Sequence, residues 1–342
     1  MALCGPRAIA RAGTLDYRLK LQVAAEVDTN AERKEGNERK TDGATRFLAR
    51  GSVTWRPAEH HVLQTRIDVG AKVFFRLNDE DLLVTSANLA YSFSAADWLS
   101  LGVDGGLKDR HERSSETDYL QSSGGGSLRL VLSRYFDLRV RAGYQRFEFR
   151  PDDMSFGYKG DDYSLELTAF PARRMRLSAS YSIGRRGYRA PVFVANPTAP
   201  QGFSVGSEQR DDQVHSADLR WRLLRKVLVE TSYAYQLVRS NSYGFSYARH
   251  RVAAQVSSRL PFGFFGHLAG ALQLLSFRDP VFIDPVLFIE DDNRNWVAVK
   301  LSRELGKGFS MELRYAFFAS GFSGDALYYR RHVAALGFAY AL

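Results

Sequence analysis

Histidine and serine are two kinds of side chain in this sequence that could carry acid–base or nucleophilic chemistry. None of the seven histidines stands in an HExxH arrangement, which would place two metal ligands on one helix face. In VHSAD (214–218), His215 precedes Ser216 directly, but neighbouring residues of a strand point to opposite faces. We therefore expect no enzyme activity, no catalytic residue and no metal site. The histidines are His60, His61, His111, His215, His250, His267 and His332.

The glycine-rich segment SSGGGSLRL (122–130) is the nearest approach to a phosphate-binding loop. Such a loop ends in Lys followed by Ser or Thr, and this segment has neither. The single cysteine, Cys4, excludes an internal disulfide and a cysteine-rich zinc site. The sequence therefore predicts no cofactor.

Charge is the remaining chemical resource of the chain, which has 47 Lys and Arg against 38 Asp and Glu. The bases are spread along the whole sequence and form no dense run, so we expect no nucleic-acid partner. The mean hydropathy of −0.29 lacks the apolar excess of a helical membrane protein. The function of the charges thus depends on the elements that position them.

Those elements repeat with a period of two residues. In MRLSASYSI (175–183), Met, Leu, Ala, Tyr and Ile alternate with Arg and Ser, and VLVETSYAYQL (227–237) alternates in the same way. This period is typical of β-strands that have one apolar and one polar face.

About 16 such segments are present, most of about 10 to 14 residues, and a tilted strand needs ~9–11 residues to cross a bilayer. They lie near 15–27, 44–55, 61–74, 82–94, 98–108, 119–133, 138–150, 161–170, 175–186, 215–224, 227–239, 247–260, 264–277, 294–304, 309–319 and 329–342.

The connections alternate between short turns, such as 225–226 and 306–308, and longer polar loops, such as 29–43 and 108–118. Short turns at one end and long loops at the other are typical of a bacterial outer-membrane barrel. Lipid offers no partner to backbone N–H and C=O groups, so a sheet in lipid must close on itself. We predict an all-β fold, a membrane-spanning antiparallel up-and-down β-barrel of about 16 strands, with 14–18 possible. The alternative is a soluble β-sandwich or propeller.

Residues 14–342 are expected to form this single barrel, with both termini in the periplasm. The preceding segment, MALCGPRAIARAG (1–13), has no apolar core of the kind found in a signal peptide. We expect it to be disordered or truncated, with the natural start of the protein lying upstream.

Aromatic residues gather near both kinds of connection, as expected for rings at the two membrane interfaces. Trp55 and Trp98 are examples beside short turns. The expected belt beside the long loops is Phe74, Phe147, Phe149, Tyr235, Tyr247, Trp296, Phe317 and Tyr329.

The last segment, YYRRHVAALGFAYAL (328–342), resembles the assembly signal of bacterial outer-membrane barrels. Its matching residues are Gly337, Tyr340 and Leu342, although Phe or Trp is more usual at the last position. With the barrel pattern, the chain resembles a porin-type outer-membrane protein, which implies outer-membrane lipid and the barrel assembly machinery as partners. A weaker likeness, carried by YYRRH (328–332), is to β-barrel porins found beside exopolysaccharide export systems.

If the apolar positions face lipid, their neighbours line the lumen. The bases placed inward by this parity are Arg18, Lys20, Arg46, Arg50, Arg66, Lys72, Lys108, Arg129, Arg139, Arg141, Arg176, Arg220, Arg222, Arg251, Arg259, Lys300, Arg314 and Arg331. The corresponding acids are Asp16, Glu26, Asp68, Asp104, Glu148, Glu166, Asp218, Glu230, Glu304 and Glu312. The bases outnumber the acids, which predicts a net-positive lumen, unless pairing across strands leaves the charges a structural role.

The sequence thus favours an outer-membrane channel, passive or mildly anion-selective, for hydrophilic solutes. The alternatives are an outer-membrane conduit for polysaccharide or protein export, with a periplasmic export partner, and a non-conducting structural or adhesive barrel. The longest connection, Gly187 to Val214, contains the apolar PVFVA (191–195). It is expected either to fold inward as a constriction or to pack at the rim.

Overall fold

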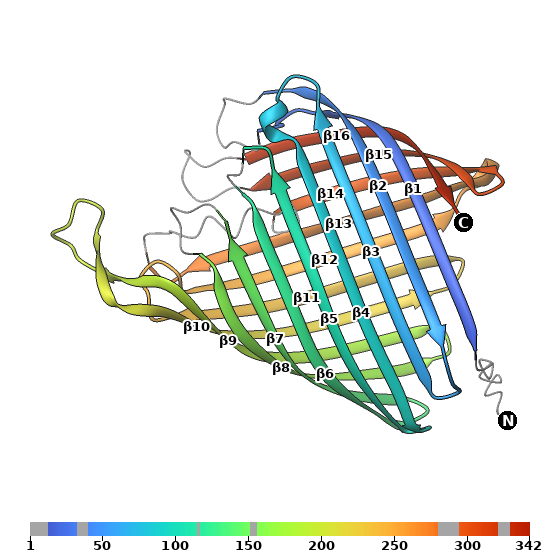
Figure 1. Ribbon diagram of the computed structural model, residues 1–342, viewed down its shortest axis with the longest axis horizontal. Coiled ribbons are helices and arrows are strands. Elements are labelled where there is room, and N and C mark those ends of the chain that lie inside the picture. Colours follow the sequence, from blue (N-terminus) through green and yellow to red (C-terminus); the bar gives the residue numbers. More distant parts are fainter. Residues whose placement is uncertain (1–12, 33–39, 115–116, 151–155, 280–293, 321–328) are drawn as a thin grey trace.

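The computed structural model describes residues 13–32, 40–114, 117–150, 156–279, 294–320 and 329–342. These residues form 16 antiparallel strands in one closed barrel, in which each strand pairs with the next along the chain and β16 pairs with β1 (Figure 1). The predicted fold class and strand number are confirmed.

The strands have these bounds: β1 Thr14–Asp28, β2 Asp42–Arg56, β3 His61–Phe74, β4 Leu82–Ala96, β5 Leu99–Glu112, β6 Tyr119–Ser133, β7 Phe136–Phe149, β8 Tyr158–Ala172, β9 Met175–Ala195, β10 Phe203–Leu224, β11 Val227–Ser240, β12 Tyr247–Arg259, β13 Phe264–Phe277, β14 Asn295–Gly306, β15 Phe309–Ser320 and β16 Tyr329–Ala341. Two short 3₁₀ turns, Asn78–Glu80 and Pro261–Gly263, accompany them. No helix in these described ranges has the length and apolar character needed to span a membrane.

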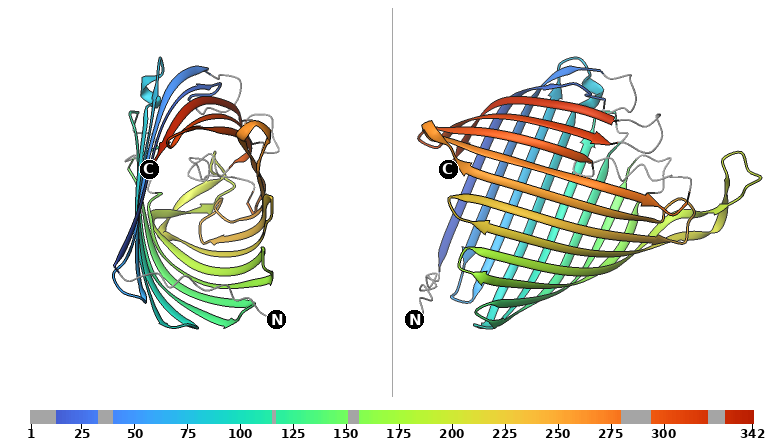
Figure 2. Two further views of the ribbon diagram at one scale, coloured as in Figure 1. Left: turned by 90° about the vertical axis from the view of Figure 1, so that its right-hand side faces the viewer. Right: turned by 180° about the vertical axis from the view of Figure 1, so that it is seen from behind.

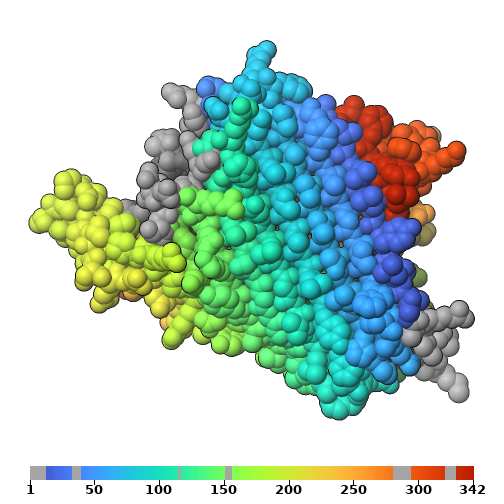
Figure 3. Space-filling view, in the orientation of Figure 1, coloured from blue at the N-terminus to red at the C-terminus, as the bar shows by residue number. Residues whose placement is uncertain are grey.

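The alternation of the sequence becomes two faces of one wall. In β16, every second residue from Tyr329 to Ala339 is buried, while Leu336 and Phe338 between them are 49% and 50% exposed. Large exposed apolar side chains recur on the outer face of the other strands, and Figure 3 shows β1–β7 as one continuous outer wall. An apolar outside with a polar inside suits lipid on the outer face.

The ends of the barrel differ as predicted. Short connections such as 225–226 lie at one end, and longer ones such as 29–41 lie at the other. The C-terminus and the start of β1 lie at the short-turn end, as Figure 2 also shows. Residues 1–12 lie outside the described part of the chain.

The long segment from Gly187 to Val214 does not fold inward as a constriction, and at its base it packs on a neighbouring connection at the rim, as the second expectation has it. It is not a loop, because β9 and β10 continue as a two-stranded hairpin of 21 and 22 residues, joined by a turn at 196–202. The hairpin projects beyond the ends of the neighbouring strands and does not fold into the lumen (Figure 2). Strand pairing satisfies backbone groups of PVFVA, and the Phe193 ring packs against those of Phe203 and Phe245, which gives an apolar side chain of this segment a partner.

The base of this hairpin is fixed by a cation between two rings. The guanidinium of Arg210 lies 4.0 Å from the ring centre of Tyr188 and 3.6 Å from that of Phe245, and it pairs with Asp212 at 2.6 Å. Phe193 also donates its amide to Ser242 Oγ in the β11–β12 connection, at 2.8 Å. The hairpin is therefore anchored to its neighbour before it leaves the barrel.

Candidate functional site on the inner face of the barrel

The strands place the bases of the parity argument on the face opposite the exposed apolar side chains, and their lining of a pore stays a prediction. On β1, Arg18 and Lys20 alternate with the exposed Tyr17 and Leu21, and the same relation holds on the other strands. The strand register keeps this parity from strand to strand, because directly paired residues share a face.

Several of these bases share carboxylates across strands that are not neighbours. The carboxylate of Glu312 on β15 forms ion pairs with Lys20 of β1, at 2.8 Å, and with Lys300 of β14, at 2.9 Å. Arg141 of β7 lies between Asp104 of β5, at 2.8 Å, and Asp162 of β8, at 3.2 Å. Such bridges require the side chains to face the same enclosed space.

Other bases have a carboxylate close by along the wall. Asp68 pairs with both Arg50 and Arg66. Arg129 pairs with Asp137, and looser contacts of 3.7 to 3.9 Å join Arg176 to Glu166, Arg220 to Asp218 and Arg222 to Glu230.

Five predicted arginines have no such partner. Within the described ranges, none of them makes an ion pair or a side-chain hydrogen bond. They come from β1, β2, β7 and β12 and are Arg18, Arg46, Arg139, Arg251 and Arg259. The pairing alternative therefore describes many of the predicted bases but not these five.

A buried ionic cluster joins β16 to β1, where the barrel closes, at the end of the barrel with the long loops. Asp28 is fully buried at the end of β1, and its carboxylate forms ion pairs with Arg331 of β16 at 2.6 Å and with Lys72 of β3 at 2.7 Å. Lys72 forms a second ion pair with Glu26 at 2.5 Å. Arg331 and Lys72 were predicted as lumen bases, but Asp28 was missed, because it lies at a strand end just outside the predicted segment.

Asp28→Asn is expected to lower the free energy of unfolding by about 3–5 kcal/mol, because Arg331 is left buried without its carboxylate. Urea unfolding in detergent micelles measures this change. The matched variant Asp16→Asn removes a carboxylate from an exposed pair with Arg56 and should cost less than about 1 kcal/mol. Equal losses in the two variants would show that burial of the cluster contributes nothing.

Two predictions need correction: one acid expected on the inner face, and several rings expected in the interfacial belt. Glu148 lies on the outer face of β7, because the even-numbered residues of this strand share a face with the exposed Tyr144. It pairs there with Arg146. Several rings assigned to the belt beside the long loops alternate with outward side chains and lie on the inner face: Phe74, Phe147, Phe149, Tyr247, Trp296 and Tyr329. Tyr235 and Phe317 are outward, as expected.

The histidines mostly serve the outer face. Four of them accept or donate a hydrogen bond through Nδ1 to a tyrosine hydroxyl on the adjacent strand, at 2.6 to 2.8 Å. The pairs are His61–Tyr91, His215–Tyr181, His250–Tyr233 and His332–Tyr315. In the part of the chain that the structure describes, no three His, Cys, Asp or Glu side chains converge on a possible metal site.

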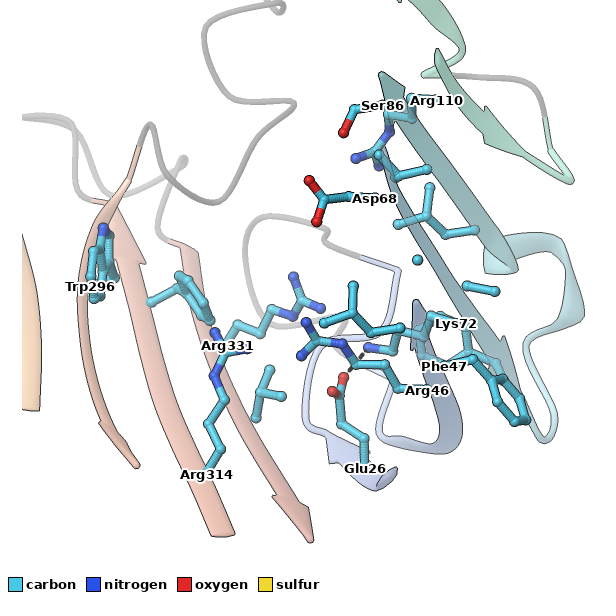
Figure 4. A pocket seen from close by; sticks show the side chains of 18 residues that line it. Glu26, Arg46, Phe47, Asp68, Lys72, Ser86, Arg110, Trp296, Arg314 and Arg331 are labelled. Atoms are coloured by element: carbon cyan, nitrogen blue, oxygen red, sulfur yellow. Dashed lines mark ion pairs between the residues drawn. The ribbon is translucent and has the colours of Figure 1, made fainter. Parts of the chain in front are cut away.

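A cavity of about 410 Å³ lies between the two sides of the barrel wall (Figure 4). Arg46, Asp68 and Lys72 line it from β2 and β3, and Trp296, Arg314 and Arg331 line it from β14, β15 and β16. Basic side chains thus face one another across the space that the closed sheet encloses.

Comparisons with solved structures agree with this architecture. OmpF of Salmonella typhi, solved in a complex with daunomycin, has a TM-score of 0.55 and 11% identity, over 97% of this chain and 98% of that one. CdiB from Acinetobacter baumannii gives 0.52 and 12%, over 95% of this chain and 60% of that one. The fold is that of an outer-membrane β-barrel.

A bacterial polysaccharide outer membrane secretin is also similar, with a TM-score of 0.46 and 9% identity, over 95% of this chain and 97% of that one. No family model matches the chain, and no curated protein does. At these identities the likenesses bear on the fold of this barrel alone.

Proposed function

We propose that the protein is a channel of the bacterial outer membrane, which passes hydrophilic solutes through a net-positive lumen with a mild preference for anions. In this proposal both termini lie in the periplasm, the long loops face the exterior, and outer-membrane lipid surrounds the apolar wall.

The observation that carries the proposal is that five inner-face arginines pair with no carboxylate within the described ranges. Most inner-face carboxylates named above already contact a base, whereas Arg18, Arg46, Arg139, Arg251 and Arg259 contact no carboxylate within the described ranges. Fixed positive charge in a water-filled pore raises the local concentration of anions and lowers that of cations.

The test is the zero-current potential of the purified barrel in a planar bilayer between two KCl concentrations. We expect a potential whose sign reports faster chloride than potassium passage, and it should weaken as the salt rises, because mobile ions screen the fixed charge. A potassium-selective potential contradicts the net-positive lumen, and a protein that inserts without conducting contradicts the channel itself.

The export-conduit alternative, with its periplasmic partner, stays a prediction, since no described feature favours it. The assembly signal at Gly337, Tyr340 and Leu342 also stays a prediction. Leu342 is 62% exposed, and its amide donates to the Leu19 carbonyl at 2.9 Å.

A further inference from the structure

The cavity of Figure 4 is lined by carboxylates that are already paired with bases and by an arginine, Arg46, that is not paired with a carboxylate within the described residues. Its two lining carboxylates already have partners, because Glu26 holds Lys72 and Asp68 holds Arg50 and Arg66. Arg46 lines the same cavity, is only partly buried, and has no ion pair or side-chain hydrogen bond to any residue that the structure describes.

An arginine in this state offers a planar fork of N–H donors that fits the two oxygens of a carboxylate. Before a solute binds, water satisfies these donors. A carboxylate that replaces the water gains two charge-assisted hydrogen bonds without displacing an existing protein partner.

The remaining walls indicate the body of the molecule to which the carboxylate belongs. Trp296 of β14 and Phe318 of β15 supply rings, and Leu82 and Val84 of β4 supply aliphatic side chains. A volume of about 410 Å³ falls within the range typical of small-molecule sites. Inorganic anions use neither the rings nor the aliphatic surface.

We propose that this cavity is a binding site for small organic monocarboxylates with a flat or branched apolar body, and that Arg46 binds the carboxylate. The inference rests on the proposed channel function and specifies one class of solute for it. Lys72 and Arg331 stay paired with Glu26 and Asp28, so Arg46 is the base that we assign to the carboxylate.

The first experiment uses sodium benzoate as the probe and benzyl alcohol as its neutral counterpart. Benzoate is added to single channels in a planar bilayer, and the half-blocking concentration is read from the decrease in ion current. We expect benzoate to reduce the current at millimolar concentration, whereas benzyl alcohol and acetate at equal concentration should reduce it much less.

Three variants locate the site. Arg46→Gln should raise the half-blocking concentration of benzoate by about tenfold or more, since it removes the paired donors. Arg46→Lys should raise it by less, because the charge remains and the fork is lost. Arg259→Gln removes the same charge from the short-turn end of β12, outside the cavity, and should change the benzoate block by less than about twofold.

Equal effects of Arg46→Gln and Arg259→Gln on the half-blocking concentration would overturn the site. Benzoate would then respond only to the total positive charge of the lumen. An absence of benzoate block in a channel that is still anion-selective would overturn the site and leave the proposed function intact. If the barrel does not conduct, equilibrium dialysis of radiolabelled benzoate against the protein in detergent replaces the block. Binding that is lost in Arg46→Gln then supports the site although the channel fails, and no binding overturns it.

Discussion

Replacement of the five uncommitted arginines by glutamine is expected to abolish or reverse the anion preference. The quintuple variant carries Gln at Arg18, Arg46, Arg139, Arg251 and Arg259. A change of about one kT in the lumen potential alters the ratio of anion to cation concentration by about sevenfold. The ratio of chloride to potassium permeability should therefore decrease by several fold, as measured from the zero-current potential in a KCl gradient.

The control removes the same formal charge from the connections at the short-turn end, outside the strands. It carries Gln at Arg134, Arg173, Arg174, Arg225 and Lys226. We expect its permeability ratio to stay close to that of the unmodified protein, because solvent and salt screen charges outside the lumen. If both variants shift the ratio equally, net charge and not the position of the arginines determines the selectivity.

Gly337→Val is expected to prevent closure of the barrel. Gly337 of β16 pairs with Ala24 of β1, and a Cβ at Gly337 would lie 2.6 Å from the Ala24 Cβ and closer still to the Val23 carbonyl oxygen. The backbone of the seam must separate to admit it, which should cost about 3 kcal/mol or more. Folded barrel, identified by its anomalous migration in unheated gels, should be nearly absent from outer-membrane fractions.

Gly51→Val is the matched substitution, because a Cβ there meets nothing within 4 Å. It should assemble normally. Refolding of Gly337→Val from urea into detergent, without assembly machinery, separates packing from recognition. Failure in both settings is the result expected from a steric clash, while normal refolding in detergent would attribute the defect to loss of the assembly signal instead.

The period-two pattern predicted the strands because it follows from the environment of the wall: each strand borders lipid on one side and an enclosed polar space on the other. The same parity is the basis of the expected lumen bases, from Arg18 on β1 to Arg314 on β15, whose role in a pore stays a prediction. The parity rule failed where the two faces of a strand carry the same type of residue. At the long-loop end both faces carry rings, so residue type alone could not place Trp296 or Tyr247.

Sequence could not predict which charges pair, because partners such as Lys20 and Glu312 are 292 residues apart and come together only when β16 closes on β1. It also could not distinguish a loop from a continued hairpin between β9 and β10, since the prolines in this segment usually interrupt strands. Pro191 is accommodated at an irregular stretch where the register shifts between Val205 and Asp211.

The central claim is that the apolar side of each strand contacts acyl chains and the polar side contacts water. Adjacent residues of β8 test it most directly: Leu165, 49% exposed on the outer face, and Ser164 on the inner face. Each is changed to cysteine in a Cys4→Ser background, spin-labelled and reconstituted into bilayers. Collision rates are then measured with oxygen, which concentrates in lipid, and with a water-soluble nickel chelate.

We predict that the label at position 165 collides mainly with oxygen and the label at position 164 mainly with the nickel chelate. The opposite assignment, or the same accessibility at both positions, would contradict the membrane orientation of the wall and the channel function that depends on it.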